Sequence, residues 1–419
     1  MLTPATQRFI AQHLGDDVYA LSLKAKQYPD VDIRLALQQI EARQRCVKKL
    51  PALCADASWV FPPRLSQEQC SSEQTALYKA QIIKNAFDLS ENTSGPSTPP
   101  LDKGRCPEGG GVEKTTLVDL TGGMGVDTLF CAAQCQSAVY VEQNTELCQL
   151  ARHNFAGKNI RVVNADSAEY LLGMPPADII LIDPARRDNK GRKVAALQDC
   201  TPDITTLWET IQTKCRLCLV KLSSMLDVTE ALRQLTGIIQ VHYVGAQGEC
   251  KEVLLVWNKD NNGEATRIVH EPETQDFVFT HAEESNSRYD IADAVGKFLH
   301  VPSASMLKAA PFKLLCQRHG VKALASNTHI YTSDTIPEGW HGKSYTVAGV
   351  YSMGKNDIKA LCTLGAADIT VKNAPFTADQ LRKRLRLKDG GDNHLFACTL
   401  ADGAIRIIHC KKNSALNTY

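Results

Sequence analysis

Between residues 116 and 221 the sequence alternates short apolar runs with stretches of helical character. The apolar runs lie at residues 116–120, 138–141, 161–163, 179–182 and 217–221. Strands that alternate with helices form a parallel sheet, because each crossover helix returns the chain to the edge where it began. We therefore expect an α/β domain built on a doubly wound parallel sheet.

Two further apolar runs, at residues 240–244 and 253–257, end this pattern. They lie too close together for a parallel crossover, which needs about a dozen residues or more, so we expect them to pair antiparallel. A parallel sheet with such an ending resembles the class I methyltransferases that use S-adenosylmethionine (SAM). It is not the usual ending of a nicotinamide-binding domain. The resemblance implies a Rossmann-like sheet of seven strands.

The first strand leads into the turn Asp119-Leu120-Thr121-Gly122-Gly123-Met124-Gly125-Val126-Asp127. Glycines let a backbone turn sharply and approach a ligand, and the start of the following helix favours an anion. SAM brings a carboxylate and an ammonium group at its methionine end. We assign Asp119 to the ammonium group, and the turn supplies the other predicted cofactor-binding residues: Thr121, Gly122, Gly123, Gly125 and Asp127.

Acidic residues also follow the second and third strands. Glu142 lies about twenty residues past the glycine turn, where a carboxylate accepts hydrogen bonds from ribose hydroxyls. Asp166, followed by Ser167, lies where an acid of SAM enzymes commonly reaches the adenine amino group. We assign all three residues to cofactor binding. Taken alone, each acid also fits a solvated strand end or a helix cap.

The fourth strand ends in Asp183-Pro184-Ala185-Arg186-Arg187. Open parallel sheets bind ligands beyond the carboxyl ends of their strands, so this turn faces the predicted reaction centre. We assign Asp183, Pro184 and Arg186 to catalysis, with Asp183 holding the acceptor or taking its proton. Arg187 is assigned to substrate binding, because a guanidinium group grips phosphate or carboxylate. Lys221, at the end of the fifth strand, is also assigned to the substrate, although a structural role fits it too.

Most of the chain resembles a bacterial family of SAM-dependent methyltransferases with a ferredoxin-like segment and a C-terminal THUMP-like domain. The segments that carry this resemblance are 71–73, 78–80, 183–187, 248–252, 308–312, 329–333 and 387–392. From the sequence pattern and this resemblance together, we divide the chain into an N-terminal helical region (1–90), a linker (91–115), a methyltransferase domain (116–260), a ferredoxin-like segment (261–325) and a THUMP-like domain (326–419). The two C-terminal parts are expected to be small α+β domains.

THUMP domains help modification enzymes to hold RNA, and the charge distribution fits that role. Residues 301–419 contain 16 Lys and Arg against 8 Asp and Glu, although the whole chain carries only +1. The basic residues Arg382, Lys383, Arg384 and Arg386 are therefore assigned to the RNA substrate. The same segment also fits an amphipathic helix with Leu381 and Leu385 buried and its charges merely solvated.

Two differences from related enzymes narrow the range of possible methyl acceptors. Methyltransferases of nucleic-acid amino groups often have a second proline and an aromatic residue where this chain has Ala185 and Arg186. The RNA uracil-C5 enzymes need a cysteine near the end of the fifth strand, and the residues after Lys221 include none. Cys218 lies within the strand, and Cys250 is better explained as structural.

The remaining expectations concern surroundings and partners. No run of about 18 apolar residues and no secretory signal is apparent, so a cytoplasmic protein without a membrane span is expected. The 15 cysteines are irregularly spaced and are expected to be reduced, mostly core residues, with no metal site.

The leading hypothesis is a SAM-dependent RNA methyltransferase acting on ribosomal or transfer RNA. The alternatives are an assembly factor that binds SAM or RNA without turnover, a methyltransferase for a small molecule or protein, and a nicotinamide oxidoreductase. The last is disfavoured by the predicted hairpin and by Thr128, which stands where the dinucleotide fingerprint requires glycine or alanine.

Overall fold

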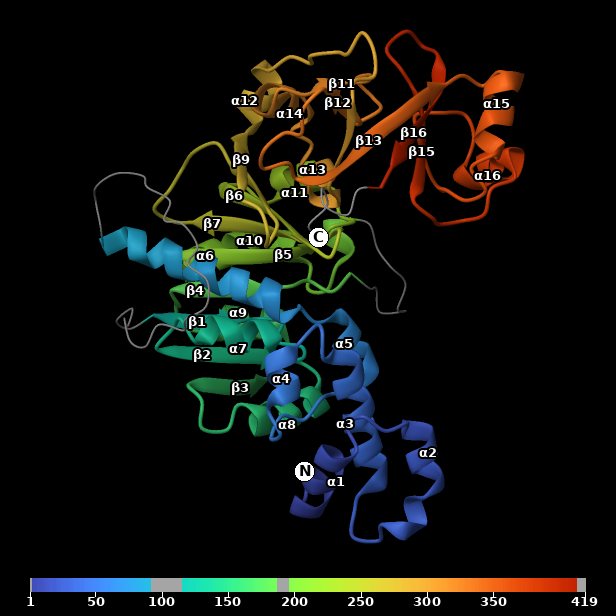
Figure 1. The fold of residues 1–419 in the computed structure, drawn as a ribbon. Helices are drawn as coiled ribbons and strands as arrows, with labels where there is room; N and C mark the ends of the chain where they lie inside the picture. The colour runs from blue at the N-terminus through green and yellow to red at the C-terminus, as the bar shows by residue number, and fades with distance from the viewer. Residues whose placement is uncertain (1, 92–114, 187–195, 413–419) are drawn as a thin grey trace. The chain divides into compact units, whose positions relative to one another are not determined.

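The computed structural model describes residues 2–91, 115–186 and 196–412 of the chain (Figure 1). The chain divides into two compact units. The first comprises Met1–Lys221, Leu226–Thr236 and Val256–Asn261. The second comprises Leu222–Met225, Gly237–Leu255 and Asn262–Tyr419. Within the described ranges, no helix is both long and apolar enough to cross a membrane.

The first unit begins with helices, drawn in blue in Figure 1. They are α1 (Pro4–Gln12), α2 (Val18–Leu23), α3 (Ile33–Cys46), α4 (Pro51–Ala55), α5 (Arg64–Gln69) and α6 (Glu73–Glu91). Helix α3 begins where the Asp32 carboxylate accepts a hydrogen bond from the Leu35 N–H at 3.1 Å. Such a cap stabilises the first turn and so favours the helix. Residues 92–114, most of the predicted linker, lie outside the described residues.

The sheet that follows confirms the predicted α/β class. Its strands are β1 (Thr116–Asp119), β2 (Ser137–Glu142), β3 (Ile160–Asn164), β4 (Ile179–Ile182), β5 (Leu217–Ser223), β6 (Ile238–Ala246), β7 (Glu249–Asn258), β8 (Thr266–His270) and β9 (Phe277–Thr280). They lie in the order β3-β2-β1-β4-β5-β7-β6-β8-β9. The pairs β1–β2, β1–β4, β2–β3 and β4–β5 are parallel, as expected from the crossover helices.

The hairpin is also confirmed. β6 and β7 are neighbours in the sheet, and only Gln247 and Gly248 join them. Both residues have positive φ, +55° and +77°, which is the backbone of a two-residue hairpin turn and fixes the strands as antiparallel. The seven predicted strands are β1 to β7, and two further strands, β8 and β9, extend this sheet to nine. These strands come from residues assigned to the ferredoxin-like segment.

Five helices of the described residues accompany the strands of the first unit: α7 (Val126–Ala132), α8 (Thr145–Asn154), α9 (Ser167–Gly173), α10 (Ile204–Lys214) and α11 (Val228–Gln234). Asp203 caps α10, because its carboxylate stands one residue before the helix and accepts a hydrogen bond from the Thr205 N–H.

α6 packs against α7, and a core links the N-terminal helices to the sheet. This core includes Trp59 and Phe61 from the helical region, Tyr140 from β2 and Phe155 after α8. Apolar burial is the main favourable term in such packing. The N-terminal helices are therefore part of the folded body that carries the glycine turn.

The second unit contains a seven-stranded sheet in the order β11-β12-β10-β13-β16-β15-β14. Its strands are β10 (Phe298–Pro302), β11 (Lys322–Ala323), β12 (Tyr331–Ser333), β13 (Gly342–Tyr351), β14 (Asp368–Lys372), β15 (Asn393–Thr399) and β16 (Ile405–Lys411). Its helices are α12 (His281–Asn286), α13 (Ala304–Ala309), α14 (Phe312–His319), α15 (Lys355–Cys362) and α16 (Ala378–Leu385). α15 and α16 cover part of the sheet through a core that includes Leu361, Leu381 and Leu385.

Candidate functional site

The glycine turn connects β1 to α7 with a backbone that requires glycine at two positions. Gly123 and Gly125 have φ values of +52° and +84°, and Gly125 precedes the first residue of α7. Gly122 is required for a different reason. A Cβ atom there would lie 2.2 Å from Cε2 of Tyr140, whose hydroxyl donates a hydrogen bond to the Gly123 carbonyl at 2.5 Å. Tyr140 therefore packs against the turn and holds its backbone in place.

This close approach predicts a steric effect at Gly122. We expect Gly122→Ala to lower the free energy of unfolding by about 1–3 kcal/mol, because the buried Tyr140 ring has to move. Gly173→Ala is the matched control, since nothing lies within 4 Å of its Cβ position in α9. Urea denaturation of both variants tests this, and equal midpoints would contradict the role of Tyr140.

Asp119 ends β1 and lies buried beneath the turn. Its Oδ1 accepts a hydrogen bond from the Thr121 N–H at 3.0 Å, and its Oδ2 accepts one from the Thr128 hydroxyl at 2.5 Å. Burial raises the pKa of Asp119 to about 7, although these two hydrogen bonds act in the opposite direction. The neighbouring carboxylates Asp127 and Asp183 add to the rise.

The raised pKa of Asp119 predicts a pH-dependent affinity for SAM. An ammonium ligand favours the ionised carboxylate, whose fraction rises about eightfold from pH 6 to pH 7.5 if the pKa is about 7. We therefore expect SAM to bind severalfold more tightly at pH 7.5 than at pH 6, measured by calorimetry. Asp119→Asn should abolish this dependence. An Asp119→Asn variant that binds SAM as tightly as the natural protein at pH 7.5 would exclude Asp119 as the partner of the ammonium.

The acids after β2 and β3 already have backbone partners. Glu142 Oε2 accepts from the Gly123 N–H at 3.0 Å, and its Oε1 accepts from the Asn144 N–H at 2.8 Å. The exposed Asp166 caps α9 by accepting from the N–H groups of Ala168 and Glu169. The Ser167 hydroxyl donates to the Leu120 carbonyl at 2.7 Å. Glu142 thus supports the glycine turn directly, whereas Asp166 has the capping role that its sequence position also allowed.

The Asp183 turn begins where β4 ends. The Asp183 N–H donates to the Thr121 hydroxyl at 2.6 Å, so this turn is tied to the glycine turn. Pro184 is buried, and Ala185 pairs with Thr201 in a short antiparallel bridge. Arg186 is half-buried, and Arg187 lies outside the described residues.

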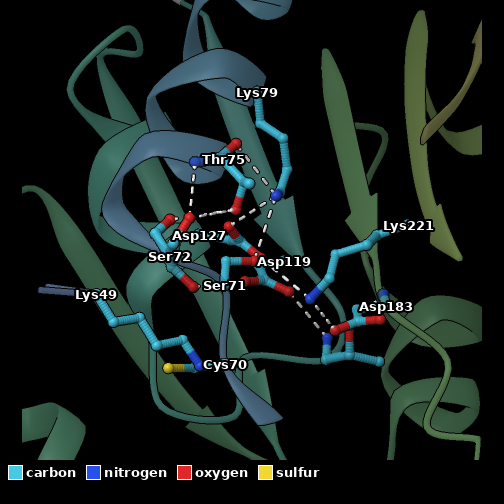
Figure 2. Close-up of polar contacts among 12 residues, drawn as sticks. Lys49, Cys70, Ser71, Ser72, Thr75, Lys79, Asp119, Asp127, Asp183 and Lys221 are labelled. Atoms are coloured by element: carbon cyan, nitrogen blue, oxygen red, sulfur yellow. Dashed lines mark hydrogen bonds and ion pairs between the residues drawn. The ribbon is translucent and has the colours of Figure 1, made fainter. Parts of the chain in front are cut away.

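A cluster of opposite charges joins these turns (Figure 2). Lys221 Nζ lies 2.5 Å from Asp183 Oδ2 and 3.6 Å from Asp127 Oδ2, and Lys79 Nζ lies 3.2 Å from Asp127 Oδ1. The Ser71 hydroxyl donates to Asp127 Oδ2 at 2.7 Å. Burial alone would raise the pKa of Asp127, but Lys79, Lys221 and Ser71 hold it below its usual value. Asp127 is therefore ionised, and the ammonium groups of Lys79 and Lys221 balance its charge.

Sequence reasoning assigned no role to three residues of this site. Lys79 and Ser71 come from the N-terminal helical region, and Tyr140 comes from the middle of β2. Lys79 had a recognisable signal. It stands on the apolar face of α6, three residues after the buried Ala76 and four before the buried Ile83, where a charged side chain needs a partner.

The predicted RNA-binding residues lie on or beside α16 in the second unit. The helix is amphipathic, with Leu381 and Leu385 buried and Lys383, Arg384 and Arg386 exposed. Arg382 differs from the other three. Its side chain forms ion pairs with Asp389 at 2.5 Å and Asp379 at 3.5 Å, so its charge is partly neutralised within the unit.

The cysteines and acids suggest no metal centre in the described part of the chain. No group of three or more His, Cys, Asp or Glu residues there is arranged to hold a metal ion. The cysteines in these ranges are free thiols, and most are buried.

Comparison with known proteins shows similarity along the whole chain. A Porphyromonas gingivalis W83 protein, provisionally described as a methyltransferase, has a crystal structure that matches 99% of this chain and 100% of its own, with a TM-score of 0.80 and 27% identity. An uncharacterized SAM-dependent methyltransferase of Mycobacterium tuberculosis, found in two strains, is 25% identical over 243 residues. That match covers 57% of this chain and 64% of the relative, which is less than two thirds of the relative's length.

Family comparisons find both kinds of domain that were expected in the C-terminal part of the chain. Residues 298–339 match a ferredoxin-like domain, and residues 342–412 match a THUMP domain-like family. The sheet with its terminal hairpin is that of the class I SAM-dependent methyltransferases. More narrowly, the chain is similar to methyltransferases that combine this fold with a ferredoxin-like segment and a C-terminal THUMP-like domain.

Proposed function

We propose that this protein transfers a methyl group from SAM to RNA, in particular to ribosomal or transfer RNA. One observation carries the proposal. The glycine turn, Glu142 and Asp183 are linked by hydrogen bonds at the carboxyl ends of β1, β2 and β4, where open parallel sheets bind ligands.

The residues of this edge fit SAM. Among the described residues beyond its chain neighbours, the Thr121 carbonyl oxygen is the one atom within 4 Å of the Gly123 Cβ position, at 3.8 Å, which leaves room for a ligand on this side of the turn. Asp119 offers a carboxylate to the ammonium group, and Glu142 offers one to the ribose hydroxyls. When bound, SAM supplies an electrophilic methyl group. Asp183, whose side chain is 38% exposed, is placed to orient the acceptor and to take its proton.

The proposal of RNA as acceptor draws on the second unit. Its THUMP domain-like match and the exposed basic residues of α16 are the features expected of a surface that neutralises phosphates. Lys383, Arg384 and Arg386 are the exposed cations of this segment that carry the proposal, because Arg382 is already paired.

Incubation of the full chain with methyl-labelled SAM and total RNA from a strain that lacks the protein tests the proposal. Label in RNA is the expected result. Label only in protein or small metabolites would show that this protein methylates an acceptor other than RNA. SAM binding without transfer to any of these would show an assembly factor without turnover, and failure to bind SAM would refute the proposal entirely.

The contribution of α16 can be measured separately. A variant with Lys383→Gln, Arg384→Gln and Arg386→Gln should bind RNA more weakly, with a salt dependence reduced by about one unit of slope for each lost phosphate contact. The matched control removes three exposed cations elsewhere, through Lys24→Gln, Lys26→Gln and Arg34→Gln. Equal RNA affinity and salt dependence in the two variants would exclude α16 from the RNA surface.

A further inference from the structure

The paired charges around Lys221 bear on the chemical nature of the acceptor. Lys221 Nζ lies 2.5 Å from Asp183 Oδ2, and the Lys221 side chain is only 11% exposed compared with 38% for Asp183 (Figure 2). A molecule that enters this edge therefore meets the Asp183 carboxylate with an ammonium group directly behind it. Asp127, which Lys79 also contacts, lies 3.6 Å from the same ammonium and keeps it within the cluster.

The positive charge of Lys221 affects two kinds of acceptor in opposite ways. A neutral amine nitrogen becomes more positive as it takes up a methyl group, and a neighbouring ammonium group opposes that change. A hydroxyl oxygen gives up its proton as the methyl group arrives and carries partial negative charge, which the same ammonium group stabilises. The Asp183–Lys221 pair thus combines a proton acceptor with a cation, the combination that favours a hydroxyl group.

The residues after Asp183 point in the same direction. An enzyme that methylates a base amine takes the base out of its stack and holds it between aromatic or apolar side chains. Here the residues after the buried Pro184 are the exposed Ala185 and the half-buried Arg186, and neither provides a ring. These residues therefore offer no aromatic stacking to a flipped base, whereas a guanidinium group suits a phosphate of the sugar backbone.

We propose that the acceptor atom is a hydroxyl oxygen, and that in RNA it is the 2′-hydroxyl of a ribose. This inference rests on the proposed function, because it takes SAM as the methyl donor and RNA as the acceptor. The 2′-hydroxyl is the hydroxyl that nucleotides within an RNA strand present, and it distinguishes RNA from DNA. Asp183 and Lys221 are then catalytic residues, and Lys79 is a positioning residue that acts through Asp127.

The transfer step balances without another reagent. A lone pair of the 2′-oxygen forms the new O–CH₃ bond while the S–CH₃ bond of SAM breaks and leaves its electron pair on sulfur. The hydroxyl proton passes to the Asp183 carboxylate and from there to solvent. The positive charge that sulfur loses leaves as that proton, and nothing is oxidised or reduced.

The position of the label in RNA decides between the acceptor atoms. RNA that has been methylated with labelled SAM is hydrolysed with alkali, which cleaves a strand only where the 2′-hydroxyl is free. We expect the label in alkali-resistant dinucleotides. Label in mononucleotides would mean base methylation, which overturns the hydroxyl acceptor but leaves the RNA methyltransferase intact. SAM binding without label in RNA would overturn both proposals.

Substitution of Lys221 tests the role of its charge. Lys221→Met should lower the single-turnover rate at saturating SAM by about 10²-fold, and Lys221→Arg should restore part of that loss. SAM affinity by calorimetry should change little, and the exposed Lys158→Met serves as the control. A folded Lys221→Met variant that is as fast as the natural protein, or faster, would overturn the role of the ammonium. If that variant fails to fold, the alkali experiment on the natural protein still decides the acceptor.

Discussion

Asp183→Asn is expected to lower the rate of methyl transfer about 10³-fold while leaving the affinity for SAM within about threefold. The amide keeps the shape of the carboxylate but cannot take the proton of the acceptor. It also removes the charge that Lys221 contacts at 2.5 Å, so the acceptor is oriented less well. The effect should appear in the single-turnover rate with labelled SAM, because the proposed mechanism gives Asp183 its role in the chemical step.

Asp227→Asn is the matched control for this substitution. Asp227 belongs to the same unit and caps α11 by accepting hydrogen bonds from the Thr229 and Glu230 N–H groups. Asparagine caps helices about as well as aspartate, so stability and rate should both be preserved. If the Asp183→Asn variant keeps a tenth of the natural rate or more, Asp183 is not the proton acceptor of the reaction.

Lys79→Met is expected to lower the free energy of unfolding by about 3–5 kcal/mol, because it removes one partner from a buried ion pair. The Lys79 side chain is 0% exposed and its Nζ lies 3.2 Å from Asp127 Oδ1. Without Lys79, Asp127 keeps its contacts with Lys221 and the Ser71 hydroxyl but loses its fully buried partner. Urea denaturation followed by tryptophan fluorescence, to which the buried Trp59 of the same unit contributes, should detect the loss.

Two further variants separate the charge from the packing. Lys84→Met removes a half-buried lysine from the same helix and should change stability by no more than about 0.5 kcal/mol. Lys79→Met combined with Asp127→Asn should recover part of the stability lost in the single variant, because the uncompensated buried charge is then absent. If the double variant is less stable than Lys79→Met, the loss comes from packing and not from charge.

The apolar runs predicted the parallel strands to within one or two residues. Such runs are reliable here because β1, β4 and β5 are buried almost throughout and so need continuous apolar sequence. The glycine turn was also predictable, since φ values of +52° and +84° leave little choice but glycine. The strands β8 and β9 were not placed individually, because they follow a polar loop and lie outside the alternation of strands and helices.

The cluster that supports the candidate site was beyond sequence reasoning for a different reason. Ser71 and Asp127 are 56 residues apart in the chain, and no local pattern records a contact between them. Local patterns did place Asp119, Glu142 and Asp183 at strand ends, because parallel strands bring their carboxyl ends to one edge. The local patterns did not show that Lys221 would contact Asp183, since a lysine near the end of a strand is usually solvated.

The pairing of α6 with α7 sets a practical limit on reusing this fold. A polypeptide trimmed to begin at β1 would keep all the glycines and strand-end acids, yet it would lose the Ser71 and Lys79 side chains that contact Asp127. Anyone who transplants the sheet as a SAM-binding module should carry residues 71–91 with it or replace Asp127 by a neutral side chain. A SAM-binding module that keeps these contacts therefore has to include residues that precede β1 in the sequence.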